Sequence, residues 1–279
     1  MSLVKKVIQK ILSALGYKLN HLSEIQVSFD NFANLVEAYE QRLNESNGPI
    51  PTNEIRPRLL ARLLGTRPSE AYFIVQALDQ CKNLNGDVCE FGVAQGETSA
   101  LIANEIALSG NKNLHLFDSF EGLPNPSEKD QLKDDIFSLD SMEAYAGTMS
   151  YPEDMVRARL KAISFPSQRY VIHKGFIEQI LTKDGGLPKA VSFAYVDFDF
   201  YDPIKLTLEF LHGITPNGAI IIVDDYDFFS TGPKAAVDEF LQAKNSMEIV
   251  YECFVPNIRY GYFAVLTKKG YLDDKGVNQ

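Results

Sequence analysis

The chain has 279 residues, of which 45% are hydrophobic and 23% are charged. These values are ordinary for a globular protein and leave room for one large domain with an appendage. The net charge of −10 excludes general nucleic-acid binding, because no basic excess exists to neutralise phosphates. No apolar run approaches the roughly 18 residues of a membrane span, and we recognise no signal peptide, so we expect a cytoplasmic protein.

The first 50 residues carry two helical patterns and predict a helical N-terminal appendage. Residues 2–15 place Leu, Val and Ile on one face and lysines on the other. Such a helix either lies on an anionic membrane surface or packs its apolar face on the core or on a second subunit. We favour packing and expect a homo-oligomer. A second pattern covers residues 24–43, and a turn-rich stretch, 44–51, separates the appendage from the main domain over residues 51–279.

Two further helices are expected over residues 57–64 and 69–83. Arg56, Arg58 and Arg62 lie at the first of them, and most such arginines are solvated or ion-paired on the surface. The cysteines are odd in number and scattered, which predicts small buried thiols rather than disulfides or a zinc site. They are Cys81, Cys89 and Cys253.

A glycine-rich turn follows the first strand of the main domain. Residues 88–91 form a short apolar strand, and the turn continues with the spacing Glu-x-Gly-x-x-x-Gly, from Glu90 through Gly92 to Gly96. Glycines at a strand–turn–helix junction let backbone N–H groups approach a ligand at the helix N-terminus. Glu90, at the strand end, can accept from a ligand's amino group. The alternative is a turn that merely requires two glycines.

A second short strand, residues 114–118, ends in Asp118. It lies about 20 residues after the glycines, where α/β nucleotide-binding folds place the acid that binds the ribose hydroxyls. The polar stretch 125–150 then shows no clear periodicity. A loop that long inside a compact domain is usually a functional lid or disordered, and we expect a lid.

Strands and helices alternate over the rest of the chain. The pattern predicts helices over 152–163, 177–181, 203–212 and 234–243, and strands over 170–173, 191–196, 219–223, 249–255 and 260–266. Alternation of this kind predicts an α/β fold with a doubly wound, mostly parallel sheet. The last two strands fit an antiparallel hairpin at its end.

Acidic residues follow three of these strands. Asp118 ends one strand, Asp197 and Asp199 follow the next but one, and Asp224 and Asp225 follow the strand after that. Ligands of such sheets bind outside the carboxyl ends of the strands. Carboxylates gathered there need a cation or must share protons, and oxygen ligands suit a hard divalent ion such as Mg²⁺. The alternative is that some of these acids cap helices or solvate loops.

With these motifs in order, the chain resembles the class I S-adenosylmethionine-dependent methyltransferases, and within them the macrocin O-methyltransferase (TylF/MycF-like) family. The resemblance covers residues 56–267. It rests on Glu-Phe-Gly-Val-Ala-Gln-Gly at 90–96, Phe-Asp-Ser-Phe-Glu-Gly-Leu-Pro at 117–124, Val-Asp-Phe-Asp-Phe-Tyr at 196–201, and the stretch 218–226 with its Val-Asp-Asp-Tyr. It implies a seven-stranded, Rossmann-like methyltransferase fold over residues 51–279.

The resemblance also implies the roles of individual residues. The residues that would bind S-adenosylmethionine are Glu90, Gly92 and Gly96 for the methionine part, Asp118 with Ser119 beside it for the ribose, and Gly175 and Phe176 for the adenine. The residues that would hold Mg²⁺ are Asp197, Asp224 and Asp225. Asp197 is in addition the candidate general base.

We therefore expect an O-methyltransferase that acts on a hydroxyl of a sugar or sugar-bearing small molecule, either a natural product or a surface-polysaccharide precursor. The alternatives are a catechol-type phenol O-methyltransferase, an NAD-dependent or nucleotide-sugar oxidoreductase, and a non-catalytic binding module. The glycine spacing argues against the oxidoreductase, and the clustered acids argue against the module. Two departures from the family are Phe198, where glycine is usual, and Val93-Ala94-Gln95, where a bulky aromatic residue and an arginine are frequent.

Overall fold

The computed structural model describes residues 31–32, 34–35, 53–108, 112–183, 185–248 and 250–269. The predicted helices over residues 2–15 and 24–43 lie outside these ranges, apart from 31–32 and 34–35, which are helical. The side chain of Asn34 donates to the backbone carbonyl of Arg259 at 2.7 Å, so this short piece contacts the main domain close to its last strand.

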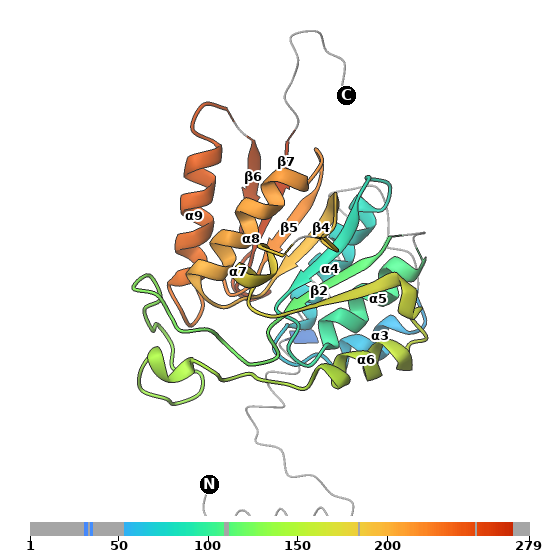
Figure 1. Ribbon diagram of the computed structural model, residues 1–279, viewed down its shortest axis with the longest axis horizontal. Coiled ribbons are helices and arrows are strands. Elements are labelled where there is room, and N and C mark those ends of the chain that lie inside the picture. The colour runs from blue at the N-terminus through green and yellow to red at the C-terminus, as the bar shows by residue number, and fades with distance from the viewer. Residues whose placement is uncertain are drawn as a thin grey trace, which may run out of the picture.

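Seven strands form one sheet in the described part of the chain, in the order β3-β2-β1-β4-β5-β7-β6 (Figure 1). They are β1 (Asp87–Phe91), β2 (Leu114–Asp118), β3 (Tyr170–Lys174), β4 (Val191–Val196), β5 (Ile220–Val223), β6 (Tyr251–Phe254) and β7 (Ala264–Lys268). Strands β1 to β5 pair in parallel, and β7 is antiparallel to both β5 and β6. The predicted mostly parallel sheet with a closing antiparallel hairpin is confirmed.

Helices cover both faces of the sheet (Figure 1). One layer holds α3 (Arg56–Leu60), α4 (Pro68–Cys81), α5 (Glu97–Leu108) and α6 (Glu153–Ala162), and the other holds α7 (Ile177–Ile180), α8 (Tyr201–Ile214) and α9 (Gly232–Lys244). Successive residues of the central strand β4 alternate between two cores: Phe193 packs toward α4 and α5, and Ala194 toward α8. Because every β4 residue is buried, its sequence is apolar apart from Ser192, whose hydroxyl donates to the backbone carbonyl of Gly86, as expected for a doubly covered parallel strand.

The edge strand β6 differs from the central strands. Only its first residue is buried, because nothing in the described structure pairs with its outer edge. Cys253 is consequently exposed, whereas Cys81 and Cys89 are buried, and all three thiols are free. The prediction of reduced cysteines holds, but the prediction that Cys253 is buried was wrong, since an apolar sequence on an edge strand does not guarantee cover.

The loop between β2 and α6, which includes the predicted lid 125–150, runs along the carboxyl edge of the sheet (Figure 1). Its one regular element among the described residues is the 3₁₀ helix η1 (Glu143–Tyr145). Tyr145 and Met142 form a small core with Phe200 and Phe229. The Asp130 carboxylate accepts from the backbone N–H of Tyr201 at 2.8 Å. The loop is therefore packed on the segments that follow β4 and β5, and its movement as a lid stays a prediction.

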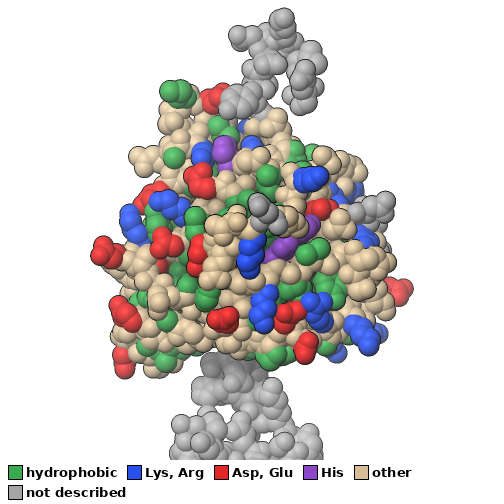
Figure 2. Space-filling view, in the orientation of Figure 1, with side chains coloured by type: hydrophobic (Ala, Val, Ile, Leu, Met, Phe, Trp, Pro, Cys, Tyr) green, Lys and Arg blue, Asp and Glu red, His purple; other side chains and the backbone are tan. Residues whose placement is uncertain are grey.

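The surface agrees with the charge balance of the sequence. On the face shown in Figure 2, lysine and arginine side chains are scattered among acidic ones and form no continuous basic patch. None of the helices in the described ranges combines the length and apolar character that a membrane crossing needs.

Candidate active site

A cavity of about 1090 Å³ opens at the carboxyl ends of β1, β2, β4 and β5. Its walls come from the loops after these strands, from the loop 119–151, and from residues 64–67 before α4. Nine of the sequence-predicted site residues line it: Glu90, Gly92, Asp118, Ser119, Gly175, Phe176, Asp197, Asp224 and Asp225. Gly96 does not. It is buried, and a Cβ at this position would lie 3.1 Å from Val156 of α6, so its contact is with a helix.

The turn after β1 is held close to β4. Gly92 has φ +82°, and a Cβ there would lie 1.8 Å from the carbonyl oxygen of Asp197. No other residue fits this approach, because the conformation is left-handed and the space is filled by backbone. The amide of Asp197 donates to the carbonyl of Phe91 at 2.7 Å. Gly92 thus lets the predicted cofactor turn and the predicted metal loop touch.

Asp118 organises the same turn from the end of β2. Its Oδ2 accepts from the amides of Val93 at 2.7 Å and Ala94 at 3.0 Å, and its Oδ1 accepts from Phe120 at 2.6 Å. A carboxylate has roughly four lone-pair positions, so these bonds leave acceptor capacity toward the cavity. Ser119 donates to the carbonyl of Gly122 at 3.0 Å and fixes the turn after β2.

Glu90 is the most unusual group on the cofactor side. It is 1% exposed, and its Oε2 has no hydrogen-bond partner among the described residues. Burial raises the pKa of Glu90 to about 8. The Ser99 hydroxyl lowers this pKa by a smaller amount, and Asp118 and Glu97 raise it slightly further. Because an unpaired buried carboxyl oxygen is costly, its place in the cavity wall fits a ligand that brings a cationic amino group.

We expect ligand binding at Glu90 to release a proton. With a pKa of about 8, the free carboxyl is protonated at pH 7, and an ammonium group placed against it favours the ionised form. Titration of S-adenosylhomocysteine at pH 7, in buffers with different ionisation enthalpies, should show proton release at most of the sites. Glu90→Gln should abolish the release, and Glu97→Gln should retain it. A wild-type release near zero would contradict the contact.

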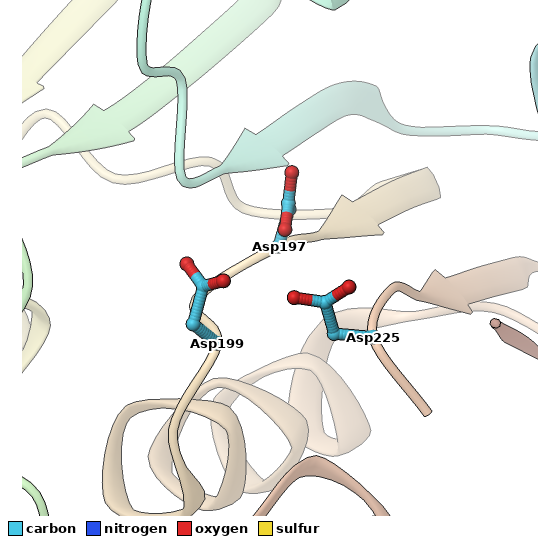
Figure 3. A group of neighbouring side chains, drawn as sticks. All are labelled: Asp197, Asp199 and Asp225. Carbon is cyan, nitrogen blue, oxygen red and sulfur yellow. The ribbon is translucent and has the colours of Figure 1, made fainter. Parts of the chain in front are cut away.

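Three carboxylates gather on the other side of the cavity. Asp197 and Asp199 follow β4, Asp225 follows β5, and one oxygen of each lies within 4.8 Å of the others. Figure 3 shows the three side chains turned toward a common space between the two loops. Asp199 and Asp225 both have positive φ, +62° and +54°, a strained conformation for residues with a Cβ that often marks functional sites.

Asp224 does not belong to this group. Its Oδ1 accepts from the amide of Asp225 at 2.7 Å, and its Oδ2 accepts from the hydroxyl of Tyr195 at 2.5 Å. The same hydroxyl lies 3.1 Å from Oε1 of Glu70, a residue of α4 that is 2% exposed. The structure therefore groups Asp199, rather than Asp224, with the other two acids, and the metal-binding role of Asp224 stays a prediction.

Full ionisation of the three clustered carboxyl groups is unfavourable. Burial raises the pKa values of Asp197, Asp199 and Asp225 well above their ordinary range, and the neighbouring carboxylates raise them further. Such a cluster either shares protons or binds a cation. An all-oxygen donor set fits a hard divalent ion such as Mg²⁺.

Two arginine positions differ in their surroundings. Arg56, near the predicted cleft in the sequence, forms a largely buried ion pair with Glu105 at 2.5 Å. Arg67 instead lines the cavity. The sequence gives no signal for this position beyond the start of a helix.

The family model described as macrocin-O-methyltransferase (TylF) matches residues 50–253. The chain belongs to this family. The match contains every predicted site residue and shows that the protein is an O-methyltransferase, which removes the oxidoreductase and the non-catalytic module as alternatives.

Solved structures agree with the TylF assignment at the level of fold. The O-methyltransferase NovP is 19% identical, with a TM-score of 0.61 over 89% of this chain and 100% of its own. The calicheamicin methyltransferase CalS11 is 20% identical, with a TM-score of 0.59 over 92% of this chain and 96% of its own. An apo structure of CalS11, described as a TDP-rhamnose 3'-O-methyltransferase, gives a TM-score of 0.53 at 19% identity, over 90% of this chain and 97% of its own. A search of curated protein sequences finds no match.

Proposed function

We propose that this TylF-family protein transfers a methyl group from S-adenosylmethionine to a hydroxyl of a sugar or sugar-bearing small molecule, with Mg²⁺ bound at the acidic cluster. The observation that carries the proposal is a single cavity that joins the buried carboxyl of Glu90, one oxygen of which has no hydrogen-bond partner among the described residues, to three clustered carboxylates. A sugar acceptor is supported by the family name and by the printed substrate of CalS11.

The cofactor would lie along the turns after β1, β2 and β3. Glu90 accepts from its amino group, and the backbone at Gly92 allows close approach of the methionine part. Asp118 accepts from the ribose hydroxyls, with Ser119 fixing the turn beside it. Gly175 and Phe176, which line the cavity after β3, border the adenine. S-adenosylmethionine supplies the electrophilic methyl group.

The acidic cluster would serve the acceptor hydroxyl. Asp197 and Asp225 belong both to the ligand set implied by the resemblance and to the set grouped by the structure, while Asp199 and Asp224 compete for the third position. A bound divalent ion acidifies a coordinated hydroxyl. As the acceptor oxygen bonds to the methyl carbon, the carbon–sulfur bond breaks with its electron pair on sulfur. The proton passes to a carboxylate, for which Asp197 is the candidate.

Calorimetric titration of S-adenosylhomocysteine, with Mg²⁺ and with EDTA, tests the cofactor assignment. We expect micromolar binding in both conditions, weakened about tenfold by Asp118→Asn, which exchanges a charged acceptor of the ribose for a neutral one. Asp154→Asn, an exposed acid on α6, is the matched control and should bind like the wild type. Absence of binding in both conditions would refute the cofactor assignment.

A further inference from the structure

The acceptor end of the cavity has a wall that the cofactor and the acidic cluster do not use. The cofactor turns follow β1, β2 and β3, and the acids follow β4 and β5. One part of the remaining wall comes from residues 64–67 and from Phe228, Gly261 and Tyr262. An acceptor whose hydroxyl lies at the cluster can contact this part of the wall, because both line the same cavity.

Arg67 is the charged residue of this wall. Its Nη1 donates to the backbone carbonyl of Ile258 at 3.2 Å, and its guanidinium lies 5.3 Å from the ring centroid of Tyr262. That ring in turn stacks on Phe228, with centroids 4.7 Å apart. The groups in direct contact with the guanidinium are therefore neutral. Of the five N–H donors of an arginine, one is used within the described residues.

The position of Arg67 relative to the cluster follows from its neighbour in the chain. The hydroxyl of Thr66 lies 3.5 Å from that of Tyr195, and Tyr195 donates to Asp224 at 2.5 Å. Arg67 thus follows a residue that is two hydrogen bonds from Asp224, the chain neighbour of the cluster residue Asp225. Arg67 and the cluster line the same cavity.

Arg67 forms no ion pair within 4.0 Å among the described residues, although the cavity is rich in acids and its charge favours the ionised form of Asp224 at longer range. Lys205, the other Lys or Arg among the described lining residues, donates to the Tyr201 hydroxyl and lies 3.7 Å from Glu239. Arg67 forms no comparable ion pair. A neutral ligand that covers a guanidinium without an ion-pair partner strips its hydration water and supplies no opposite charge, which is unfavourable for binding. A ligand that carries an anion avoids this cost, and arginine binds carboxylate and phosphate through paired N–H donors.

We propose that Arg67 binds an anionic substituent, a phosphate or a carboxylate, carried by the sugar whose hydroxyl is methylated. The inference rests on the proposed function, because it takes the acceptor to be a sugar placed at the acidic cluster. It narrows the acceptor to sugar phosphates, nucleotide-linked sugars and sugar acids. Neutral glycosides of the same ring should be poor ligands.

The experiment measures binding of three probes to the protein saturated with S-adenosylhomocysteine and Mg²⁺: a methyl hexopyranoside, the matching hexose 1-phosphate and the matching hexuronate. We expect at least one anionic probe to bind about tenfold more tightly than the neutral glycoside. Arg67→Gln should abolish that preference, and Arg67→Lys should retain part of it. Which anion is preferred distinguishes phosphate from carboxylate.

Arg62→Gln is the matched control, because it removes the same charge from an exposed position of the same segment and should keep the preference. An affinity for S-adenosylhomocysteine within about twofold of wild type shows that each variant is folded. If the wild type binds S-adenosylhomocysteine but prefers neither anion, or if Arg67→Gln keeps the preference, the inference is wrong and the proposed function stands. If S-adenosylhomocysteine itself does not bind, the proposed function is wrong, and the inference that rests on it is wrong as well.

Discussion

We expect Asp197→Ala to lower kcat/KM by about 10³-fold or more, since it removes both a metal ligand and the candidate base. The variant should fold, because Asp197 contributes repulsion to a cluster whose pKa values are already raised. A carboxyl whose folded pKa is raised destabilises the protein as pH rises from its unfolded pKa through its folded one. In EDTA at pH 8, Asp197→Ala should therefore unfold at a temperature no lower than that of the wild type.

The measurement is methyl transfer at saturating S-adenosylmethionine, with Mg²⁺ affinity determined in parallel. Asp154→Ala, far from the cluster in sequence and exposed, should keep wild-type turnover. Near-normal turnover of Asp197→Ala would disprove the metal and base assignment. Asp199→Asn and Asp224→Asn separate the two candidate third ligands: the one that completes the site should weaken Mg²⁺ binding about tenfold or more, and the other should affect it less.

The order of strands and helices could be predicted because burial on two faces leaves a plain sequence signal. Strand β4 is apolar except for Ser192, and the stretches between strands show helical spacing. The ends of some helices and strands differ from the predicted ends. The helix predicted over 203–212 is observed over Tyr201–Ile214, which places Pro203 in its first turn, where proline is tolerated. The closing strand predicted over 260–266 is observed over Ala264–Lys268. Tyr260 and Phe263 are apolar because they pack on the core from a loop.

In the candidate site too, some features could be predicted from the sequence and others could not. That acids at strand ends approach one another follows from the parallel sheet, so the grouping of Asp197 with Asp225 could be predicted. The position of Asp224 depends on residues far away in the sequence. Tyr195 of β4 donates to Asp224, and the same hydroxyl lies beside Glu70 of α4. A glutamate on an amphipathic helix gives no sign of such a partner. Sequence spacing likewise cannot distinguish a glycine that faces a ligand from one that packs on a helix, as Gly96 does.

Substitution of Gly92 should have the largest effect on the cofactor side. A Cβ at this position would lie 1.8 Å from the Asp197 carbonyl oxygen, and φ is +82°. The left-handed conformation alone costs about 1–2 kcal/mol for a residue with a side chain, and overpacking against backbone adds roughly 1–3 kcal/mol. Because β1 and β4 pair directly at this point, relief of the overlap requires that the turn after β1 and the loop of Asp197 separate.

We therefore expect Gly92→Ala to lower the unfolding temperature by about 6–12 °C and to weaken S-adenosylhomocysteine binding about 100-fold. Gly185→Ala is the matched control: Gly185 has φ +92° but no neighbouring atom within 4 Å of an added Cβ, and it lies before β4, at the opposite edge of the sheet. It should cost about 1–2 kcal/mol and leave binding unchanged. Equal effects of the two substitutions on stability and binding would mean that the approach of Gly92 to Asp197 is not required. A selective loss of binding in Gly92→Ala would show that this contact between two strand ends aligns the methyl donor with the acidic cluster.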